Sequence, residues 1–520
     1  MPARCWPPRA TSGPRSSASI PRSSAAAAGI DVIADAGGTR PEPVRIRSEA
    51  DRRLRHPVHV VWELTLACNL RCAHCGSRAG RPRSDELTTD EIRSIVAELA
   101  ALGTREISLI GGEAFLRRDW LDIIRAVAES GIKCGLQTGG RALSRAKIEA
   151  AVAAGLSSAG VSVDGNEAVH DRLRGVPGSF RQALAAIEEF ARAGITPGCN
   201  TQVNRLSAPV LEETYEHIYA AGARMWQIQL TVPAGNAAEQ VDLILQPWQV
   251  PETYDTLARL FERGRKAGFR LFSGNNVGYF GPYEHLWRTM TDEPAYWDGC
   301  GAAESGMAIE ADGVVKACPS LHKGEYGGGN IRDGGLTEIW LAMQESVRPN
   351  VERPAWGFCG TCYYKSVCKS GCTWTAGSLL GVPGNNPMCD HRARTLREAG
   401  LRERFEQVAP APGEPFDQGL WRLALETLDG VELPESAYPA SKQPKNPDGA
   451  ILLCKGCGHY SFAGDDGCMK CGAPLVAERP RGDFAGPREI EGVLGRLAEI
   501  DARHARRLAE IRAARRAPAE

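Results

Sequence analysis

The sequence predicts an α/β fold: a partial (β/α)6 TIM-like barrel, followed by a Cys-rich extension and a small zinc-ribbon-like module. Three observations lead to this prediction. Short apolar runs alternate six times with amphipathic helical patterns between residues 58 and 274. Seven cysteines lie in a Gly-rich region at 300–389. Four further cysteines at 454–471 form two CxxC pairs, a spacing typical of zinc ribbons.

The strand and helix patterns of the barrel succeed one another along the chain. The predicted strands cover 58–67, 105–112, 132–140, 157–165, 196–204 and 225–233. The predicted helices cover 88–103, 120–131, 144–155, 180–194 and 211–222. Strand–helix units in series predict a parallel sheet with right-handed crossovers, and continuous apolar runs suit strands buried on both faces. The regular spacing favours a barrel over a doubly wound sheet, and in either fold ligands bind at the carboxyl ends of the strands.

The first predicted helix carries the clearest local signals. Thr88 and Glu91 form a capping box at its start, and Gly103 follows its last turn. One face of the helix is apolar, formed by Ile92, Ile95, Val96 and Leu99.

Charge and cysteine content exclude several classes of protein. The 62 basic and 63 acidic residues nearly cancel, which gives no sign of a nucleic-acid or anionic-membrane partner. No apolar run reaches the roughly 18 residues of a membrane span. Seventeen cysteines without a secretion signal favour metal or catalytic thiols over disulfides, and therefore a reducing, cytoplasmic location. Cys134 and Cys199 stand alone in strand-like contexts, where buried inert thiols are expected.

Composition changes divide the chain into six expected segments. They are, in order, a disordered low-complexity N-terminus (1–50), the barrel (57–275), the Cys-rich extension (296–400), a Pro-rich linker (401–450), the zinc-ribbon-like module (451–475) and a helical tail of mixed charge (487–520).

The stretch TLACNLRCAHCGSRAG follows the first strand directly and holds Cys68, Cys72 and Cys75 at Cx3Cx2C spacing. Three thiolates can hold a [4Fe–4S] cluster and leave one iron free for an outside ligand. The alternative is a zinc knuckle that takes a fourth ligand such as His74, because structural zinc normally has four protein ligands. Either metal would sit at the mouth of the barrel.

A second motif, Gly111-Gly112-Glu113, follows the second strand. Two glycines allow a close backbone approach, and a carboxylate suits an ammonium group. Cx3Cx2C after the first strand and Gly-Gly-Glu after the second resemble the radical S-adenosylmethionine (SAM) superfamily. The resemblance implies that the free iron chelates the amino and carboxylate groups of SAM and that the Gly-Gly-Glu turn contacts the amino group. The family usually has Pro next, where this chain has Ala114.

Two further strand ends match the same family more loosely. LQTGG resembles the end of the third strand, which makes Thr138 a candidate SAM contact. VSVDG resembles the end of the fourth, where Ser162 would face the ribose or carboxylate of SAM. For both residues the alternative is a strand-end turn without a ligand. HDRLRG also looks family-like, and for its Arg174 we suggest no role beyond a salt bridge.

The cysteines of the extension resemble the SPASM pattern of radical SAM enzymes, so the resemblance covers about residues 57–400. All seven cysteines of that pattern are present. The resemblance implies two auxiliary [4Fe–4S] clusters. Their ligands would be Cys300, Cys318 and Cys372 for the first cluster, and Cys359, Cys362, Cys368 and Cys389 for the second.

Three cysteines leave the first auxiliary cluster without a fourth thiolate. We expect an open iron there, or a ligand other than cysteine such as Asp298. The alternative for this whole region is a set of zinc sites without clusters.

The C-terminal cysteines have four thiolates for one ion. Gly458 and Gly472 follow the two CxxC pairs and permit the knuckle turn. Structural zinc is predicted, with rubredoxin-like iron as the alternative, because the ligand set alone does not select the metal. The ligands would be Cys454, Cys457, Cys468 and Cys471.

The resemblance implies a radical SAM oxidoreductase. A reduced cluster on the three N-terminal cysteines would pass one electron into SAM, releasing methionine and a 5′-deoxyadenosyl radical that abstracts hydrogen from the substrate. The auxiliary clusters would accept the substrate electron or bind the substrate. An electron donor of the flavodoxin or ferredoxin type is implied as a partner. No catalytic acid or base can be singled out.

The predicted substrate is a peptide or protein undergoing post-translational modification, because SPASM proteins most often act on these. No leader-binding domain is expected ahead of Val58, so recognition would occur in trans, or through the zinc module or tail. The alternative is a small molecule, a tetrapyrrole of haem biosynthesis. Tyr279, Phe280 and Tyr283 could line its pocket, although packing against the barrel is favoured. A third hypothesis is a non-catalytic iron–sulfur electron-transfer protein.

Overall fold

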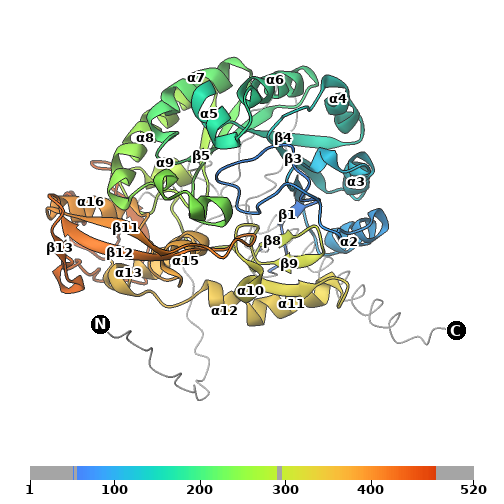
Figure 1. Cartoon of the computed structure of the whole chain (residues 1–520). Helices are drawn as coiled ribbons and strands as arrows, with labels where there is room; N and C mark the ends of the chain where they lie inside the picture. The colour runs from blue at the N-terminus through green and yellow to red at the C-terminus, as the bar shows by residue number, and fades with distance from the viewer. Residues whose placement is uncertain (1–50, 52–54, 290–294, 476–520) are drawn as a thin grey trace, which may run out of the picture.

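The computed structural model describes residue 51 and residues 55–289 and 295–475. Its largest element is a ten-stranded sheet with the order β10-β9-β8-β1-β2-β3-β4-β5-β6-β7 (Figure 1). Each strand from β1 to β7 is parallel to its neighbour, and β8 runs parallel to β1 on the other side. The expected segments 1–50 and 487–520 lie outside the described residues.

The parallel strands and the helices between them occupy residues 59 to 288. The strands are β1 (His59–Glu63), β2 (Glu106–Ile110), β3 (Lys133–Thr138), β4 (Leu156–Ser162), β5 (Pro197–Val203), β6 (Met225–Leu230) and β7 (Arg270–Ser273). The helices are α2 (Thr89–Ala101), α3 (Trp120–Glu129), α4 (Arg145–Ala153), α5 (Glu167–Arg174), α6 (Ser179–Arg192), α7 (Leu211–Ala220), α8 (Val250–Ala267) and α9 (Glu284–Arg288).

The six predicted strands correspond to β1–β6, and the five predicted helices to α2, α3, α4, α6 and α7. The capping box of α2 is present: the Thr88 side chain accepts from the Glu91 N–H, and Glu91 accepts from the Thr88 N–H at 2.7 Å. Helix α5, helix α8 and strand β7 are additions to the prediction.

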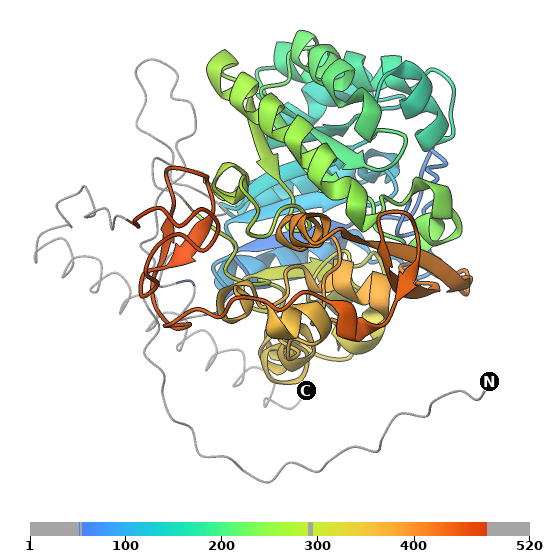
Figure 2. The same ribbon diagram turned by 90° about the vertical axis from the view of Figure 1, so that its left-hand side faces the viewer.

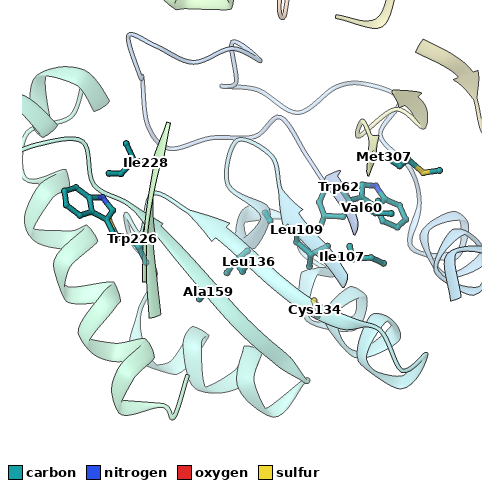
Figure 3. Close-up of a cluster of buried hydrophobic side chains, with 14 of the residues drawn as sticks. Val60, Trp62, Ile107, Leu109, Cys134, Leu136, Ala159, Trp226, Ile228 and Met307 are labelled. Carbon is teal, nitrogen blue, oxygen red and sulfur yellow. The ribbon is translucent and has the colours of Figure 1, made fainter. Parts of the chain in front are cut away.

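Buried side chains from neighbouring strands form a continuous core on one face of the sheet. Val60 and Trp62 of β1 lie beside Ile107 and Leu109 of β2, and the series continues through Leu136 and Ala159 to Trp226 (Figure 3). Cys134 and Cys199 are buried in this core, as predicted for inert thiols.

The Cys-rich extension begins as part of the same sheet. Its strands are β8 (Gly306–Ile309), β9 (Val314–Lys316) and β10 (Gly327–Asn330). Its helices are α10 (Lys323–Tyr326), α11 (Leu336–Ser346), α12 (Arg348–Val351), α13 (Gly357–Thr361), α14 (Lys365–Cys368), α15 (Thr373–Leu380) and α16 (Asp390–Glu398). Because β8 pairs with β1, the extension lies directly beside the strand that precedes the first cysteine motif.

Residues 401–450, predicted as a linker, contain a three-stranded antiparallel sheet instead. It consists of β11 (Leu401–Ala409), β12 (Leu420–Thr427) and β13 (Glu432–Leu433). Phe405 and Trp421 are buried in the main core, and the Phe405 N–H donates to Gln246 Oε1 at 2.7 Å. Local composition could not indicate this sheet, because its stability comes from contacts with residues far away in the sequence.

Residues 451–475, which we call the C-terminal cysteine module, contain the hairpin of β14 (Ile451–Leu453) and β15 (Tyr460–Phe462). Figure 2 shows this hairpin at the left of the molecule, well apart from β11 and β12 at the right. None of the helices in the described part of the chain combines the length and apolar character that a membrane span needs.

Candidate metal and SAM site

The first cysteine motif lies in a loop of residues 66–80, the cluster loop, that follows β1. The two ends of the loop are hydrogen-bonded to each other: the Cys68 N–H donates to Gly80 O at 3.2 Å, and the Gly80 N–H donates to Leu66 O at 2.8 Å. The loop therefore leaves the sheet and returns to the same place, which holds its three thiols at the carboxyl end of β1.

The Gly-Gly-Glu motif packs its backbone against the cluster loop. The N–H groups of Gly112 and Glu113 donate to the carbonyls of Thr65 and Ala67, each at 2.8 Å. A Cβ on Gly111 would clash with the Thr65 carbonyl, and a Cβ on Gly112 would lie 2.6 Å from Cys68 Cβ. Both glycines are therefore required by the close approach of β2 to the cysteine motif.

Glu113 is buried and points to the end of β3. Its carboxylate accepts from Thr138 Oγ1 at 2.5 Å and from the Gly139 N–H at 2.6 Å. Burial raises the pKa of Glu113 to about 7, against the two hydrogen bonds, which lower it. The structure thus brings three predicted residues, Gly112, Glu113 and Thr138, next to the cluster loop. Ser162 ends β4 half-buried, opposite Asn200 of β5.

The thiols of the cluster loop suit a bound metal. Burial raises the pKa of Cys68 to about 12 and that of Cys72 to about 11, so at neutral pH these thiols stay protonated unless a metal ion binds and deprotonates them. Two backbone N–H groups already point at sulfur: Leu70 N–H donates to Cys68 Sγ and Ala79 N–H to Cys75 Sγ, each at 3.4 Å. Such N–H···S contacts stabilise thiolates and are typical of iron–sulfur sites.

A buried charged group supports the loop from the side of β4 and α5. Asp164 lies 2.6 Å from Arg174 Nη2 and 3.2 Å from His74 Nε2. Burial alone would raise the pKa of Asp164, but the charges of Arg174 and His74 lower it below its ordinary value. Arg174 Nη1 also lies 3.7 Å from Cys72 Sγ. Arg174 thus forms the suggested salt bridge, and His74 directs its Nε2 to a carboxylate.

The seven cysteines of the extension fall into two groups. The first group is Cys300, Cys318 and Cys372. Burial raises the pKa of Cys372, and negative charge on Cys300 or Cys318 would raise it further, because the three thiols lie near one another. The second group lines one pocket together with Tyr279, Phe280, Tyr364 and His391. We call this space the second auxiliary pocket, and its cysteines are Cys359, Cys362, Cys368 and Cys389.

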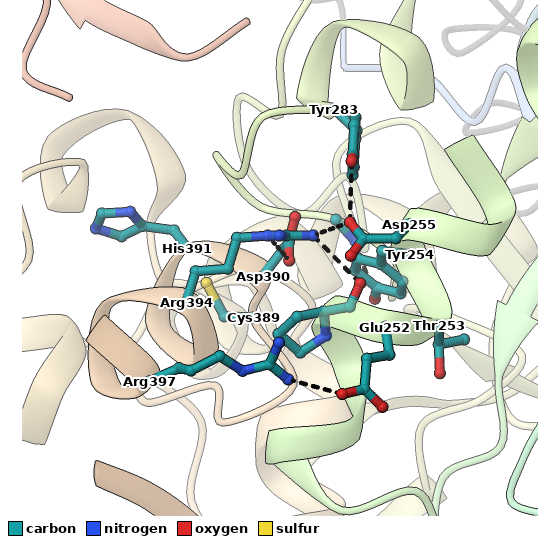
Figure 4. Close-up of polar contacts among 12 residues, drawn as sticks. Glu252, Thr253, Tyr254, Asp255, Tyr283, Cys389, Asp390, His391, Arg394 and Arg397 are labelled. Atoms are coloured by element: carbon teal, nitrogen blue, oxygen red, sulfur yellow. Dashed lines mark hydrogen bonds and ion pairs between the residues drawn. The ribbon is translucent and has the colours of Figure 1, made fainter. Parts of the chain in front are cut away.

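Helix α16 fixes the last of these cysteines against α8 (Figure 4). Cys389 is the N-cap residue of α16, and Arg394 of the next turn binds Asp390 at 2.8 Å and Asp255 of α8 at 2.6 Å. Tyr283 donates to the same Asp255 at 2.9 Å. The second auxiliary pocket is therefore held to α8 by a polar network, and Tyr283 belongs to that network.

The last four cysteines form a compact group, the C-terminal cysteine group. Their Sγ atoms all lie within 4.8 Å of one another, with Cys454 and Cys471 3.6 Å apart and Cys457 and Cys468 3.5 Å apart. A tetrahedral ion with bonds of about 2.3 Å to sulfur needs S···S separations of about 3.8 Å, so the group fits a single ion. Gly458 and Gly472 have φ of 74° and 73°, the left-handed conformation that each knuckle turn requires.

Two models of known protein families match regions of the chain that contain cysteine motifs. A model of the radical SAM superfamily matches residues 62–220, and a model of the SPASM iron-sulfur cluster-binding domain matches residues 300–363. The chain carries a radical SAM domain and a SPASM domain.

Several relatives resemble the chain over most of their own length. An AdoMet-dependent heme synthase of Methanosarcina barkeri is 29% identical over 354 residues, which cover 65% of this chain and 97% of the relative. The mycofactocin maturase MftC of Mycolicibacterium smegmatis is 28% identical over 360 residues, 68% of this chain and 87% of the relative. The solved structure of native anSMEcpe with bound AdoMet shares the fold, with a TM-score of 0.52 and 17% identity over 64% of this chain and 93% of that chain.

A loop beyond both matched ranges completes the surroundings of the cluster loop. It joins β11 to β12 (residues 410–419), and its Phe416 N–H donates to Gly76 O at 2.8 Å. The Phe416 ring lies 4.0 Å from Nζ of Lys316, which is buried and pairs with Glu310 at 2.7 Å. The loop thus connects the N-terminal cysteine motif with the strand that leads to Cys318.

Arg78 ties three segments together at this place. Its guanidinium donates to Asn236 Oδ1 at 3.0 Å, to Glu414 O at 3.0 Å and to Asp417 Oδ1 at 3.1 Å. Sequence reasoning missed Arg78, Asn236 and the 410–419 loop. Arg78 follows the Cx3Cx2C motif without being one of its residues, Asn236 and the 410–419 loop lie in no recognisable motif, and the partners of Arg78 are far away along the chain.

Replacing Arg78 by Ala is expected to lower the free energy of unfolding by about 2 kcal/mol, because partners on two segments, the half-buried Asn236 and Asp417 among them, lose their donor. Anaerobic denaturant unfolding followed by tryptophan fluorescence measures the change. The matched control is Arg93→Ala on α2, where Arg93 forms an exposed pair with Asp90 at 3.4 Å. Equal stability of the two variants would show that the Arg78 network does not hold the loop.

Proposed function

We propose that this protein cleaves SAM reductively and abstracts a hydrogen atom from a peptide or protein substrate, which it thereby modifies. The observation that carries the proposal is the packing of the three-thiol cluster loop against the Gly-Gly-Glu turn. This packing brings a metal-ligand set with three thiols next to a buried carboxylate suited to an ammonium group.

The residues of the first site have separate tasks. Cys68, Cys72 and Cys75 would hold the SAM-binding [4Fe–4S] cluster, which supplies, when bound, the electron that cleaves SAM to methionine and a 5′-deoxyadenosyl radical. The Glu113 carboxylate would accept hydrogen bonds from the SAM ammonium group. The Thr138 hydroxyl and the Gly139 N–H donate to this carboxylate and hold it in place. Ser162 remains a candidate contact at the end of β4.

The extension would hold two auxiliary [4Fe–4S] clusters, one per cysteine group. The first would have an open iron or a ligand such as Asp298, because its group has three cysteines. The second would have four thiolates. An N–H···S contact supports this assignment: the Asn386 N–H donates to Cys359 Sγ at 3.4 Å.

The finer architecture is proposed on the same basis. The parallel strands β1–β7 with their outer helices would form the partial barrel (57–275), and residues 296–400 the SPASM domain. The C-terminal cysteine module would bind structural zinc as a zinc ribbon, which its tetrahedral S···S separations support.

Both leading substrate classes have a relative: MftC is named a maturase, and the other relatives include heme synthases. A peptide is favoured by the packing of the residues suggested for a tetrapyrrole pocket. Tyr279 and Phe280 are each 1% exposed and belong to an aromatic cluster with Trp297 and Tyr364. Their N–H groups donate to Glu284 at 2.8 and 3.1 Å. The two residues therefore pack, but these aromatic neighbours belong to the extension, whereas packing against the barrel was the favoured role.

A reconstitution experiment tests the proposal. The full chain is loaded anaerobically with iron and sulfide and supplied with SAM and dithionite, and 5′-deoxyadenosine is quantified alone, with Cys-, Tyr- or Gly-rich peptides, and with Fe-coproporphyrin III. Formation of 5′-deoxyadenosine that a peptide stimulates is the expected result. Stimulation by the tetrapyrrole would assign the alternative. If no 5′-deoxyadenosine forms under any of these conditions, the hypothesis of a non-catalytic electron-transfer protein is favoured instead.

The pH dependence of SAM binding follows from Glu113. Because the pKa of its carboxyl is about 7, the affinity for the SAM ammonium should rise as the pH passes through this value and the carboxylate forms. Since this pKa is raised from 4.5, the stability that the neutral carboxyl contributes is lost as pH rises from 4.5 to about 7. Glu113→Gln should bind SAM about 10- to 100-fold more weakly, the loss expected for a charged hydrogen bond, without the pH step.

Equilibrium binding of SAM to the anaerobically loaded protein measures both effects. Glu129→Gln, at the end of α3, serves as the control for the change of charge. A pH step that survives in the Glu113→Gln protein would assign the titration to another group.

A further inference from the structure

We propose that the C-terminal cysteine module is a lid over the wall of the second auxiliary pocket that Phe280 and Tyr364 form, and that Tyr363 and Tyr364 are the positioning residues that fasten it. The lid is inferred from protein contacts alone. Its effect on a cluster rests on the proposed auxiliary cluster in that pocket.

The fastening residues come from inside the cysteine group of the pocket. Tyr363 and Tyr364 follow Cys362 directly and precede Cys368. Tyr364 lines the pocket, and its ring stacks on Phe280 with a centroid distance of 4.3 Å and an interplanar angle of 18°. His391 approaches the same ring edge-on at 5.0 Å. One face of Tyr364 therefore belongs to the wall of the cysteine pocket.

The hydroxyl groups of the same two tyrosines bind the C-terminal cysteine module. Tyr364 donates to Tyr460 O at 2.6 Å. The Tyr363 hydroxyl accepts from the Phe462 N–H at 2.9 Å and donates to Asp465 at 2.5 Å. Tyr363, Tyr364, Tyr460 and Phe462 are all 1% exposed or less. Strand β15 is thus bound through its backbone to the segment that supplies two cysteines of the pocket.

A second set of contacts holds the module to other segments beside the pocket. The Tyr460 hydroxyl donates to Ala295 O at 2.8 Å. The first knuckle approaches the segment after Phe280 so closely that a Cβ on Gly458 would clash with the Pro282 carbonyl. Lys470, between the second pair of cysteines, forms an ion pair with Glu398 of α16. The module therefore contacts the segments that carry Phe280, Tyr364 and Cys389, all of which line the pocket.

The order of this lid should depend on the metal of the C-terminal cysteine group. Its hairpin has three residues per strand, which is too small to fold without a metal or packing against a larger unit. Losing the ion would remove one of these two supports, which should loosen β15 and with it the hydrogen-bond partners of Tyr363 and Tyr364. The pocket cysteines, which are now half-buried, would then become more accessible to water and oxygen.

Exposure has a predictable electrochemical consequence. Reduction adds negative charge to a cluster that four thiolates already make negative, and water stabilises the added charge. The potential of an iron–sulfur cluster depends on its solvent exposure, so opening the lid should shift the potential of the second auxiliary cluster to more positive values.

The test compares the full-length wild-type protein with Cys457→Ser/Cys471→Ser, which removes two ligands of the C-terminal cysteine group, and with Tyr364→Phe, which keeps the ring stacking and deletes the hydrogen bond to Tyr460. Asp466→Ala is the control in the same module, where it removes an exposed ion pair with Lys445. The measurements are zinc, iron and sulfide content, backbone hydrogen exchange of residues 358–368, redox titration by EPR, and the rate of bleaching in air.

The double Cys variant is expected to lose zinc, to exchange residues 358–368 at least several-fold faster, and to bleach several-fold faster with a more positive potential. Tyr364→Phe should retain zinc and show the same changes to a smaller extent, while Asp466→Ala resembles the wild type. Unchanged exchange and bleaching after zinc loss would overturn the lid. If wild-type protein carries no second auxiliary cluster, that part of the proposed function fails, and the exchange data alone decide on the lid.

Discussion

Replacing Cys68, Cys72 and Cys75 together by Ala is expected to reduce 5′-deoxyadenosine formation to the level of a protein-free control. The reason is that the cluster loop would lose every thiol that can hold the SAM-binding cluster. The variant should contain about four fewer iron atoms per chain than the wild type, which corresponds to one [4Fe–4S] cluster. Iron and sulfide analysis of anaerobically reconstituted protein, combined with chromatographic quantification of 5′-deoxyadenosine, measures both effects.

The matched control is Cys134→Ala, a thiol buried in the core of β3 with no place in a cysteine group. It should keep its iron and its SAM cleavage and lose about 1 kcal/mol of stability from the small cavity. Wild-type iron content in the triple variant would contradict the assignment of the first site. Loss of zinc, and not of iron, from the triple variant would also contradict this assignment.

Gly112→Ala is expected to reduce SAM cleavage by about 100-fold or more, because displacement of a reacting group by about 1 Å can have this effect. The added methyl group would lie 2.6 Å from Cys68 Cβ, so the cluster loop and the Gly-Gly-Glu turn would have to separate. The hydrogen bond from the Gly112 N–H to Thr65 O, 2.8 Å long, would be strained at the same time. SAM affinity and 5′-deoxyadenosine formation are the measurements.

Gly198→Ala in β5 is the control for the loss of a glycine in a strand of the same sheet. A Cβ there would meet its nearest neighbour at 3.5 Å, an ordinary contact, so SAM cleavage should stay within a factor of about two. If Gly112→Ala behaves like Gly198→Ala, the turn and the cluster loop are not coupled as their geometry indicates.

The parallel sheet could be predicted because its signals are local. Each strand is a continuous apolar run, and each helix has its own start and stop signals, as the Thr88–Glu91 capping box of α2 illustrates. The order of strands follows from the chain order, since successive parallel strands with helical crossovers are usually neighbours. The pairing of β8 with β1 could not be inferred, because the whole series of parallel strands and helices separates these two strands in the sequence, from Glu63 to Gly306.

The sheet at 401–433 was missed for a related reason. The Pro-rich segments between Val408 and Asp448 suggested a linker, and residues 401–409, LRERFEQVA, lack the strict apolar alternation of a half-buried strand. The strands are stabilised by each other and by distant groups. Glu403, for example, is buried and pairs with Arg392 of α16. Ion pairs of this kind leave no periodic pattern in the sequence.

The residues of the candidate site also fall into those that the sequence could predict and those that it could not. Cysteine spacing and the Gly-Gly-Glu triplet identify ligands and turns because the chemistry requires those residue types at those positions. Supporting residues such as Arg78 and Phe416 have no required type, and their importance depends on which segments the fold brings together. The grouping of the C-terminal cysteines could be predicted, whereas the contact of their module with Tyr363 and Tyr364 could not.

The pairing of β8 with β1 also has a consequence for the nascent chain. During synthesis β1 has an unpaired edge on one side until residue 309 has emerged, and its sequence there is HVVWE, with Val60 and Trp62 fully buried in the finished protein. Exposed apolar edges of this kind favour pairing with other chains. A fragment that ends after the parallel strands would keep that edge permanently, so the Cys-rich half acts as an internal safeguard against self-association of the first half.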